Sequence, residues 1–143
     1  MIEIETLRRV DAWVRERVTY KRDSEVWGIP EDWKTPERTL ADGTGDCEDF
    51  AILAAHRLIA PDNGSPPADP ADLFLIACHT KGEPGLNHLL LAAKTDKGLW
   101  TCADTADKFR APAYLLDAYD EGMLRRWMRL SEAENWRLWG VGD

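Results

Sequence analysis

The hydrophobic residues change their spacing partway along the chain, and this change restricts the fold more than any other feature of the sequence. Within residues 2–18, apolar side chains recur every three or four positions, as on one face of an amphipathic helix. Residues 46–59 predict a second helix. From residue 73 onward the apolar residues form short runs that are typical of strands. This order predicts an α+β fold, with the helices packed on an antiparallel sheet.

Two segments without this periodicity connect the expected elements. Residues 19–45 mix Trp, Pro and Gly and predict an ordered, aromatic-rich loop, which usually has a function inside a small domain. Residues 61–70 are rich in Pro, Gly, Ser and Asp and predict a linker that is too short to separate two domains. A length of 143 residues is enough for one hydrophobic core, so we expect a single domain over residues 1–143.

The second half of the chain is expected to form the sheet. Asp96-Lys97-Gly98 predicts a three-residue hairpin loop with Gly98 in the left-handed conformation. Residues 112–119 predict a short helix, and residues 123–130 fit either a strand or a helix. The other expected strands are residues 73–78, 88–95 and 99–104.

Charge and hydropathy exclude several classes of partner. The formal net charge is -8, whereas nucleic-acid binding requires a basic face and anionic lipid repels an acidic protein. The sequence lacks a run of about 18 apolar residues and so predicts no membrane span. The first residues lack the basic and apolar regions of a signal peptide, which predicts a cytoplasmic protein.

Three cysteines are present, and their spacing favours neither a disulfide framework nor a zinc site. Cys78 and Cys102 lie in expected strands among apolar residues, where buried thiols are inert. Cys47 lies in the first turn of the second expected helix, where the helix dipole and the first N–H groups favour a thiolate. Cys47 is therefore the candidate nucleophile, and its amide N–H is a candidate oxyanion-hole donor. The alternative is a buried structural cysteine.

Three carboxylates surround this cysteine. Asp46, Glu48 and Asp49 place negative charge beside Cys47, and such charge disfavours the thiolate. Asp46 suits the N-cap position, and Asp49 is spaced to complete a capping box. Two interpretations remain open at this point. The acids cap the helix and lie in solvent, or they supply oxygen ligands to a hard cation, calcium above all.

The chain contains three histidines, and each is considered as the candidate general base. His56 lies on the same expected helix as Cys47, about 13 Å away along the helix axis, and cannot reach it. His79 follows the expected strand 73–78. His88 opens the expected strand 88–95 and is the stronger candidate, because of its relation to an acid on the next strand.

That acid is Asp104, and the argument depends on the length of the hairpin loop. A three-residue loop pairs Thr95 with Leu99 and makes His88 and Asp104 diagonal neighbours on one face of the sheet. An acid there would fix the tautomer and orientation of the imidazole. A two-residue loop would place the two side chains on opposite faces. Asp107 is the alternative orienting acid.

With these residues assembled, the sequence resembles the bacterial transglutaminase-like cysteine proteinases, which belong to the wider transglutaminase-like, papain-fold group. The resemblance extends over most of the chain, and its most specific part is Gly45-Asp46-Cys47-Glu48-Asp49-Phe50-Ala51. The remaining matched segments are residues 18–23, 27–28, 32–37, 43–44, 52, 87–91, 103–105 and 126–129.

The resemblance implies a papain-like fold and a role for each site residue. Cys47 would be the nucleophile, His88 the general base and acid, and Asp104 the orienting acid. Trp33 would shape the site or its oxyanion hole, although packing is its alternative role. Residues 126–129 would form the closing strand of the fold.

The resemblance also bears on metal binding. In the branch of the family that cleaves adhesins in the periplasm, acids beside the nucleophile bind calcium. The corresponding residues here are Asp46 and Glu48, with Asp49 as a further ligand. No other cofactor is implied.

The resemblance favours hydrolysis of amide bonds in a protein or peptide substrate. The same three residues would also serve a transglutaminase or a glutamine deamidase, because only the acceptor of the acyl group differs. Two alternatives from other classes remain: a non-catalytic phage or prophage module that keeps the fold, and a calcium-dependent interaction protein.

Overall fold

The computed structural model describes residues 1–21, 35–78, 88–106 and 111–129. Within these ranges, helices and strands follow one another in the order expected for an α+β chain. The elements are α1 (Ile4–Arg17), β1 (Thr19–Tyr20), α2 (Pro36–Asp42), β2 (Thr44–Gly45), α3 (Cys47–Ile59), a 3-10 turn (Pro70–Asp72), β3 (Leu73–Cys78), β4 (His88–Thr95), β5 (Gly98–Cys102), α5 (Leu115–Ala118), a second 3-10 turn (Glu121–Met123) and β6 (Leu124–Arg129).

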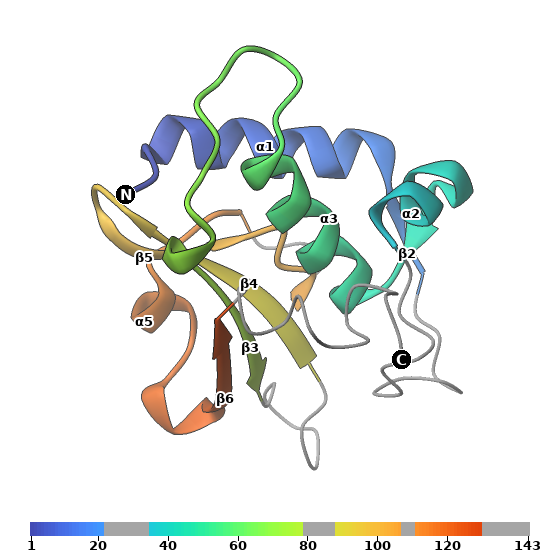
Figure 1. Cartoon of the computed structure of the whole chain (residues 1–143). Coiled ribbons are helices and arrows are strands. Elements are labelled where there is room, and N and C mark those ends of the chain that lie inside the picture. The colour runs from blue at the N-terminus through green and yellow to red at the C-terminus, as the bar shows by residue number, and fades with distance from the viewer. Residues whose placement is uncertain (22–34, 79–87, 107–110, 130–143) are drawn as a thin grey trace.

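A four-stranded sheet forms the centre of the molecule, with α1 and α3 on one face and α5 on the other (Figure 1). Its strand order is β5-β4-β3-β6, and all three pairings are antiparallel. Helix α3, whose first residue is Cys47, packs between α1 and the sheet. The predicted class, α+β with a helix start placed against an antiparallel sheet, is confirmed.

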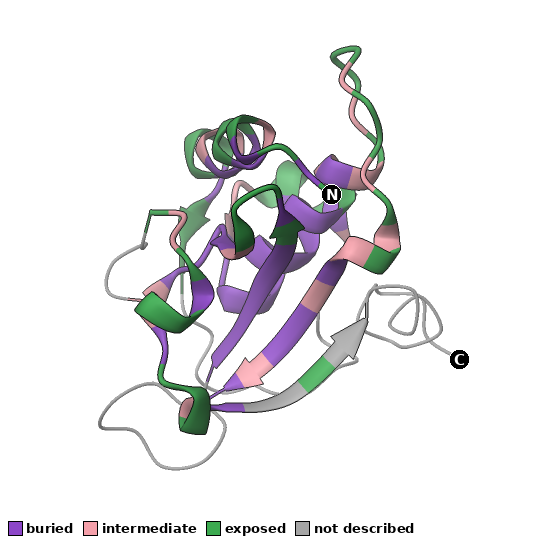
Figure 2. Ribbon diagram, turned by 90° about the vertical axis from the view of Figure 1, so that its left-hand side faces the viewer, coloured by how far each residue is buried: buried purple, intermediate pink, exposed green. Residues whose placement is uncertain are grey.

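Strand β4 is buried on both of its faces (Figure 2). Its odd-numbered apolar residues join the core that α1 and α3 cover, whereas Leu90 and Ala92 join a smaller cluster with Leu115 and Tyr119. Because side chains alternate along a strand, His88 lies on the same face as Leu90 and Ala92. The side chain of His88, the first residue of β4, therefore faces the α5 side of the sheet.

A helix lies inside the segment that was expected to be a loop. Helix α2 begins after Thr35, whose hydroxyl accepts the Arg38 N–H at 3.2 Å, and Pro36 occupies its first turn. It ends at Gly43, which has a φ of 68°. The loop prediction for residues 19–45 was wrong here, because Pro36 and Gly43 are helix start and stop signals, not interruptions.

The hairpin loop is also shorter than expected. Thr95 pairs with Gly98, so the loop has two residues and β5 ends at Cys102, two residues before the expected end. Gly98 has the expected positive φ, of 99°. The Thr95 hydroxyl closes the short loop by accepting the Lys97 N–H at 3.0 Å and donating to the Gly98 carbonyl at 2.7 Å. The three-residue prediction was wrong, because a left-handed glycine is compatible with both loop lengths.

The remaining elements agree with the sequence. The short helix expected within residues 112–119 is α5, and the ambiguous segment 123–130 contains strand β6. In the ranges that the structure describes, none of the helices has the length and apolar character that crossing a membrane requires.

Candidate active site

Cys47 lies where the chain turns from β2 into α3. Asp46 and Asp49 form the expected capping box, in which the Asp46 N–H donates to Asp49 Oδ2 at 3.2 Å. Gly45 precedes them, and a Cβ on Gly45 would lie 2.7 Å from the Cβ of Asp49. This glycine is therefore required by the Asp49 side chain, which fixes how the chain enters the helix.

The Cys47 thiol is in contact with one of the neighbouring acids. Its Sγ lies 3.2 Å from Glu48 Oε2, in the geometry of a thiol that donates to a carboxylate. Both side chains are buried, with Cys47 only 4% exposed. The sequence allowed the acids to point away from the sulfur, but Glu48 does not, and its charge favours the protonated thiol.

The carboxylates of Asp46, Glu48 and Asp49 accept hydrogen bonds from groups at the start of α3. Asp46 accepts the Asp49 N–H in the capping box, Asp49 accepts the Asp46 N–H, and Glu48 accepts the thiol. Across the described ranges, no three His, Cys, Asp or Glu side chains gather as ligands for a metal ion. In this arrangement the three acids do not form a calcium cage, and no chemical step is derived through a metal.

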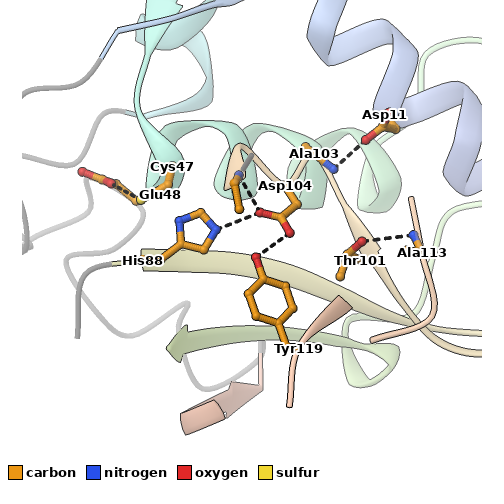
Figure 3. Close-up of polar contacts among 10 residues, drawn as sticks. Asp11, Cys47, Glu48, His88, Thr101, Ala103, Asp104, Ala113 and Tyr119 are labelled. Atoms are coloured by element: carbon orange, nitrogen blue, oxygen red, sulfur yellow. Dashed lines mark hydrogen bonds and ion pairs between the residues drawn. The ribbon is translucent and has the colours of Figure 1, made fainter. Parts of the chain in front are cut away.

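His88, Asp104 and Tyr119 form a buried hydrogen-bonded group (Figure 3). His88 Nε2 lies 2.8 Å from Asp104 Oδ1, and the Tyr119 hydroxyl donates to Asp104 Oδ2 at 2.6 Å. The Ala106 N–H also donates to Asp104, at 3.0 Å. The Tyr119 ring stacks on the imidazole at a centroid distance of 6.4 Å and an interplanar angle of 19°.

These contacts change the acidity of the Asp104 carboxyl. Burial alone would raise its pKa, because a charge in the interior loses its hydration. The hydrogen bond and the charge of His88 oppose this, and with the other two donors they hold the pKa below 3.8. Asp104 is therefore held as a carboxylate, which is the form that orients an imidazole.

The contact between His88 and Asp104 was expected, but not for the right reason. With a two-residue loop, an extended β5 would place the two side chains on opposite faces of the sheet. The strand ends before that point, and Ala103 takes a φ of 54°. Cys102 and Ala103 consequently lie in the same core cluster, and Asp104 turns to the side of His88.

The ring of His88 is directed at Asp104 on one side, and the start of α3 with Cys47 and Glu48 lies on its other side (Figure 3). Because Nε2 is committed to Asp104, Nδ1 is the nitrogen that remains for a proton from a thiol. The contacts of the site pair the imidazole of His88 with the Asp104 carboxylate and the Cys47 thiol with Glu48. A thiol, an imidazole and a carboxylate are the groups that support acyl transfer.

The other candidates are divided between the surface, the core and the undescribed parts of the chain. His56 is exposed on α3, as expected. Cys78 and Cys102 are fully buried, and burial raises the pKa of the Cys102 thiol well above its ordinary value. Trp33, His79 and Asp107 lie outside the described residues.

Two polar residues of the site were missed from the sequence. Tyr119 carries no sequence signal, because its partner is 15 residues away and its position depends on the turn of the chain after α5. Asp11 did carry a signal, since it is an acid between Leu7 and Val14 on the apolar face of α1. Its carboxylate accepts the Ala103 N–H at 2.8 Å, directly before Asp104.

Comparison with known proteins relates the chain to one family and to solved structures of a similar fold. The model of a family described as "bacterial transglutaminase-like cysteine proteinase BTLCP" matches residues 2–112. LapG of Legionella pneumophila is similar at 27% identity and a TM-score of 0.53, over 73% of this chain and 55% of LapG. Its EGTA-treated form matches at 27% identity and a TM-score of 0.53, over 73% and 53% of the two chains.

Calcium-bound LapG gives a TM-score of 0.59 over 85% of this chain and 61% of LapG, and at 24% identity it shows the fold alone. This chain thus spans between 53% and 61% of the length of the LapG chains that it matches. Among curated proteins, none matches the chain.

Proposed function

The chain belongs to the family of bacterial transglutaminase-like cysteine proteinases, and from this we propose that it hydrolyses amide bonds of a protein or peptide with Cys47 as the nucleophile. His88 would act as general base and acid, and Asp104 would orient it. The observation that carries the proposal is the 2.8 Å hydrogen bond between His88 Nε2 and Asp104 Oδ1 beside the start of α3.

The first half of the reaction forms a thioester. His88 Nδ1 takes the proton of the Cys47 thiol, and the sulfur attacks the carbonyl carbon of the substrate. The first turn of α3 supplies backbone N–H groups of the kind that hold an oxyanion, and that of Cys47 is the candidate donor. When the C–N bond breaks, His88 returns the proton to the leaving amine.

The second half releases the acyl group. A water molecule gives its proton to His88 and attacks the thioester carbonyl, which frees a carboxylic acid and returns the proton to the sulfur. Asp104 supports both halves, because its negative charge stabilises the imidazolium that forms each time. The contact of the thiol with Glu48 is exchanged for one with His88 before the first proton transfer.

Selective alkylation tests the assignment of the nucleophile. With iodoacetamide and peptide mapping, Cys47 should be labelled first, with a pH dependence that disappears in His88→Ala. Cys102 should react last, because burial raises the pKa of its thiol. Equal, slow labelling of all three cysteines would contradict the proposal.

An activity screen against peptide and glutamine-amide libraries, with Cys47→Ala as control, tests the reaction itself. Cleaved peptide bonds support hydrolysis. Release of ammonia without cleavage, or incorporation of a lysine amine, would instead assign the deamidase or transglutaminase reaction. Complete inactivity of the wild type, together with unselective labelling, would favour the non-catalytic alternative.

Calcium is retained as a separate proposal for Asp46, Glu48 and Asp49. Its support is the calcium-bound and EGTA-treated LapG structures, and the arrangement of the three acids does not add to it. Calorimetric titration with calcium after chelation is the test, with Glu48→Gln as the comparison. Heat that is lost in Glu48→Gln would assign calcium to these acids, whereas absence of heat in the wild type would remove it.

A further inference from the structure

We propose that Asp11 is a positioning residue that turns Asp104 toward His88 by holding the backbone of Ala103. This inference rests on the proposed function, because it assigns Asp11 a part in the same reaction. Asp11 would act through its hydrogen bond to the Ala103 main chain, although its charge also interacts with that of Asp104, which adds to the raised pKa of Asp11.

The first observation is that Asp11 is a buried acid with two defined partners. Its side chain is 0% exposed, one carboxylate oxygen accepts the Ala103 N–H at 2.8 Å, and the other lies 2.8 Å from Arg15 Nη2. Burial is the main cause that raises the pKa of the Asp11 carboxyl. A buried carboxylate is unfavourable unless its partners compensate, so a small apolar residue at this position of α1 would pack at a lower cost.

The second observation is the conformation of Ala103. Within the described ranges, it is the single residue other than glycine with a positive φ, at 54°. A side chain disfavours this conformation, which persists only where surrounding contacts enforce it. The ladder between β4 and β5 ends at Cys102, and the Ala103 N–H is bound instead by Asp11 from the facing helix.

The third observation is what this conformation does to Asp104. Continuation of the β4–β5 register would pair residue 104 with residue 89, on the face opposite to His88. The left-handed turn at Ala103 breaks the alternation, and the next side chain reaches His88 Nε2 at 2.8 Å. The bond from Asp11 thus acts at the residue where the direction of Asp104 is decided (Figure 3).

The chain contains a matched control for this bond. Asp96, in the hairpin loop, accepts the N–H of Ile4, the first residue of α1, at 3.0 Å. This bond also joins α1 to the β4–β5 hairpin through a carboxylate and a backbone N–H, but here the carboxylate is on the hairpin and the N–H is on the helix. It lies at the end of β5 away from Asp104. Asp96→Ala therefore reproduces the loss of a carboxylate–backbone contact without affecting Ala103.

The test compares kcat and KM for four variants of the full chain. Asp11→Ala should lower kcat about 100-fold, the effect of misplacing a reacting group by roughly 1 Å, with little change in KM. Asp11→Asn should retain most of the rate, because its amide oxygen still accepts the Ala103 N–H. Asp96→Ala should remain close to wild type. Adding Ala103→Gly to Asp11→Ala should restore at least part of the loss, since glycine adopts a positive φ without a side-chain penalty.

A second readout does not depend on activity. The proton between His88 Nε2 and Asp104 should give a low-field NMR resonance that is absent in Asp104→Asn. It should disappear in Asp11→Ala and return when Ala103→Gly is added. Wild-type kcat together with an unchanged resonance in Asp11→Ala would overturn the inference. So would equal losses in Asp11→Ala and Asp96→Ala that Ala103→Gly does not restore.

The two proposals fail in different ways. If the wild type hydrolyses no amide, the proposed function fails, while the resonance still reports whether Asp11 places Asp104. If the wild type is active and Asp11→Ala is fully active, the inference alone fails.

Discussion

At the scale of single residues, the site is a chain of hydrogen bonds that ends on one carboxylate. Asp104 binds the imidazole through one oxygen and the Tyr119 hydroxyl through the other. The family motifs predict Cys47, His88 and Asp104, because each lies in a short segment with its own pattern. Tyr119 belongs to no such segment, so its contact could be found only after the chain was folded.

Tyr119→Phe tests the hydroxyl without removing the ring that stacks on His88. A hydrogen bond to a charged group contributes about 1.5–3 kcal/mol, so we expect kcat/KM to fall roughly tenfold or more and the unfolding midpoint to drop. Kinetics on a cleaved peptide and thermal unfolding measure the two effects. Tyr114→Phe is the control, since that ring is 39% exposed. Unchanged kinetics in Tyr119→Phe would show that the hydroxyl does not assist Asp104.

At the scale of elements, the sequence predicted the start of α3 correctly but missed helix α2. Asp46 and Asp49 were correctly assigned to a capping box, which is a local signal. Helix α2 was missed although Thr35, Pro36 and Gly43 mark its ends, because only seven residues lie between and show no clear period. The contact between His88 and Asp104 was predicted correctly although the predicted hairpin register was wrong. The reason is that the alternation of side chains along β5 stops at Ala103.

Gly45→Ala tests how tightly the start of α3 is built. The added methyl group would lie 2.7 Å from the Cβ of Asp49, so that side chain must move away from the capping box. We expect a loss of about 1–3 kcal/mol in the free energy of unfolding, as for other overpacked sites. Urea unfolding measures it. Gly122→Ala is the control, because a Cβ there meets nothing within 4 Å. Equal stability of the two variants would contradict the close approach.

At the scale of the whole molecule, the site depends on both faces of the sheet. Cys47 enters from the helical side, whereas His88 faces the side of Tyr119. Asp104 reaches His88 because the end of β5 is redirected between these layers. Local sequence patterns cannot predict such an arrangement, because it depends on contacts between residues as distant in sequence as 11 and 103.

Acid unfolding should report the state of Asp104. Its pKa is lowered on folding, so its contribution to stability is complete above about pH 3.8 and is lost as the pH falls through the lower folded value. We therefore expect the difference in unfolding free energy between wild type and Asp104→Asn to shrink below pH 3.8. Urea titrations at stepped pH measure it. The pKa of Asp11 is raised on folding, so Asp11 makes the protein more stable as the pH falls, whereas Asp104 makes it less stable. The comparison of wild type with Asp104→Asn at each pH separates the contribution of Asp104. A pH-independent difference would contradict the lowered pKa.

The bond between Asp11 and Ala103 also bears on how the protein is made. Its two ends lie 92 residues apart, and Tyr119 follows later still. During translation, Cys47 leaves the ribosome well before the residues that place its proposed partners. A partly synthesised chain therefore carries only an ordinary thiol. The reactivity proposed for Cys47 would therefore appear only after synthesis has passed Tyr119 and the sheet has closed against α1.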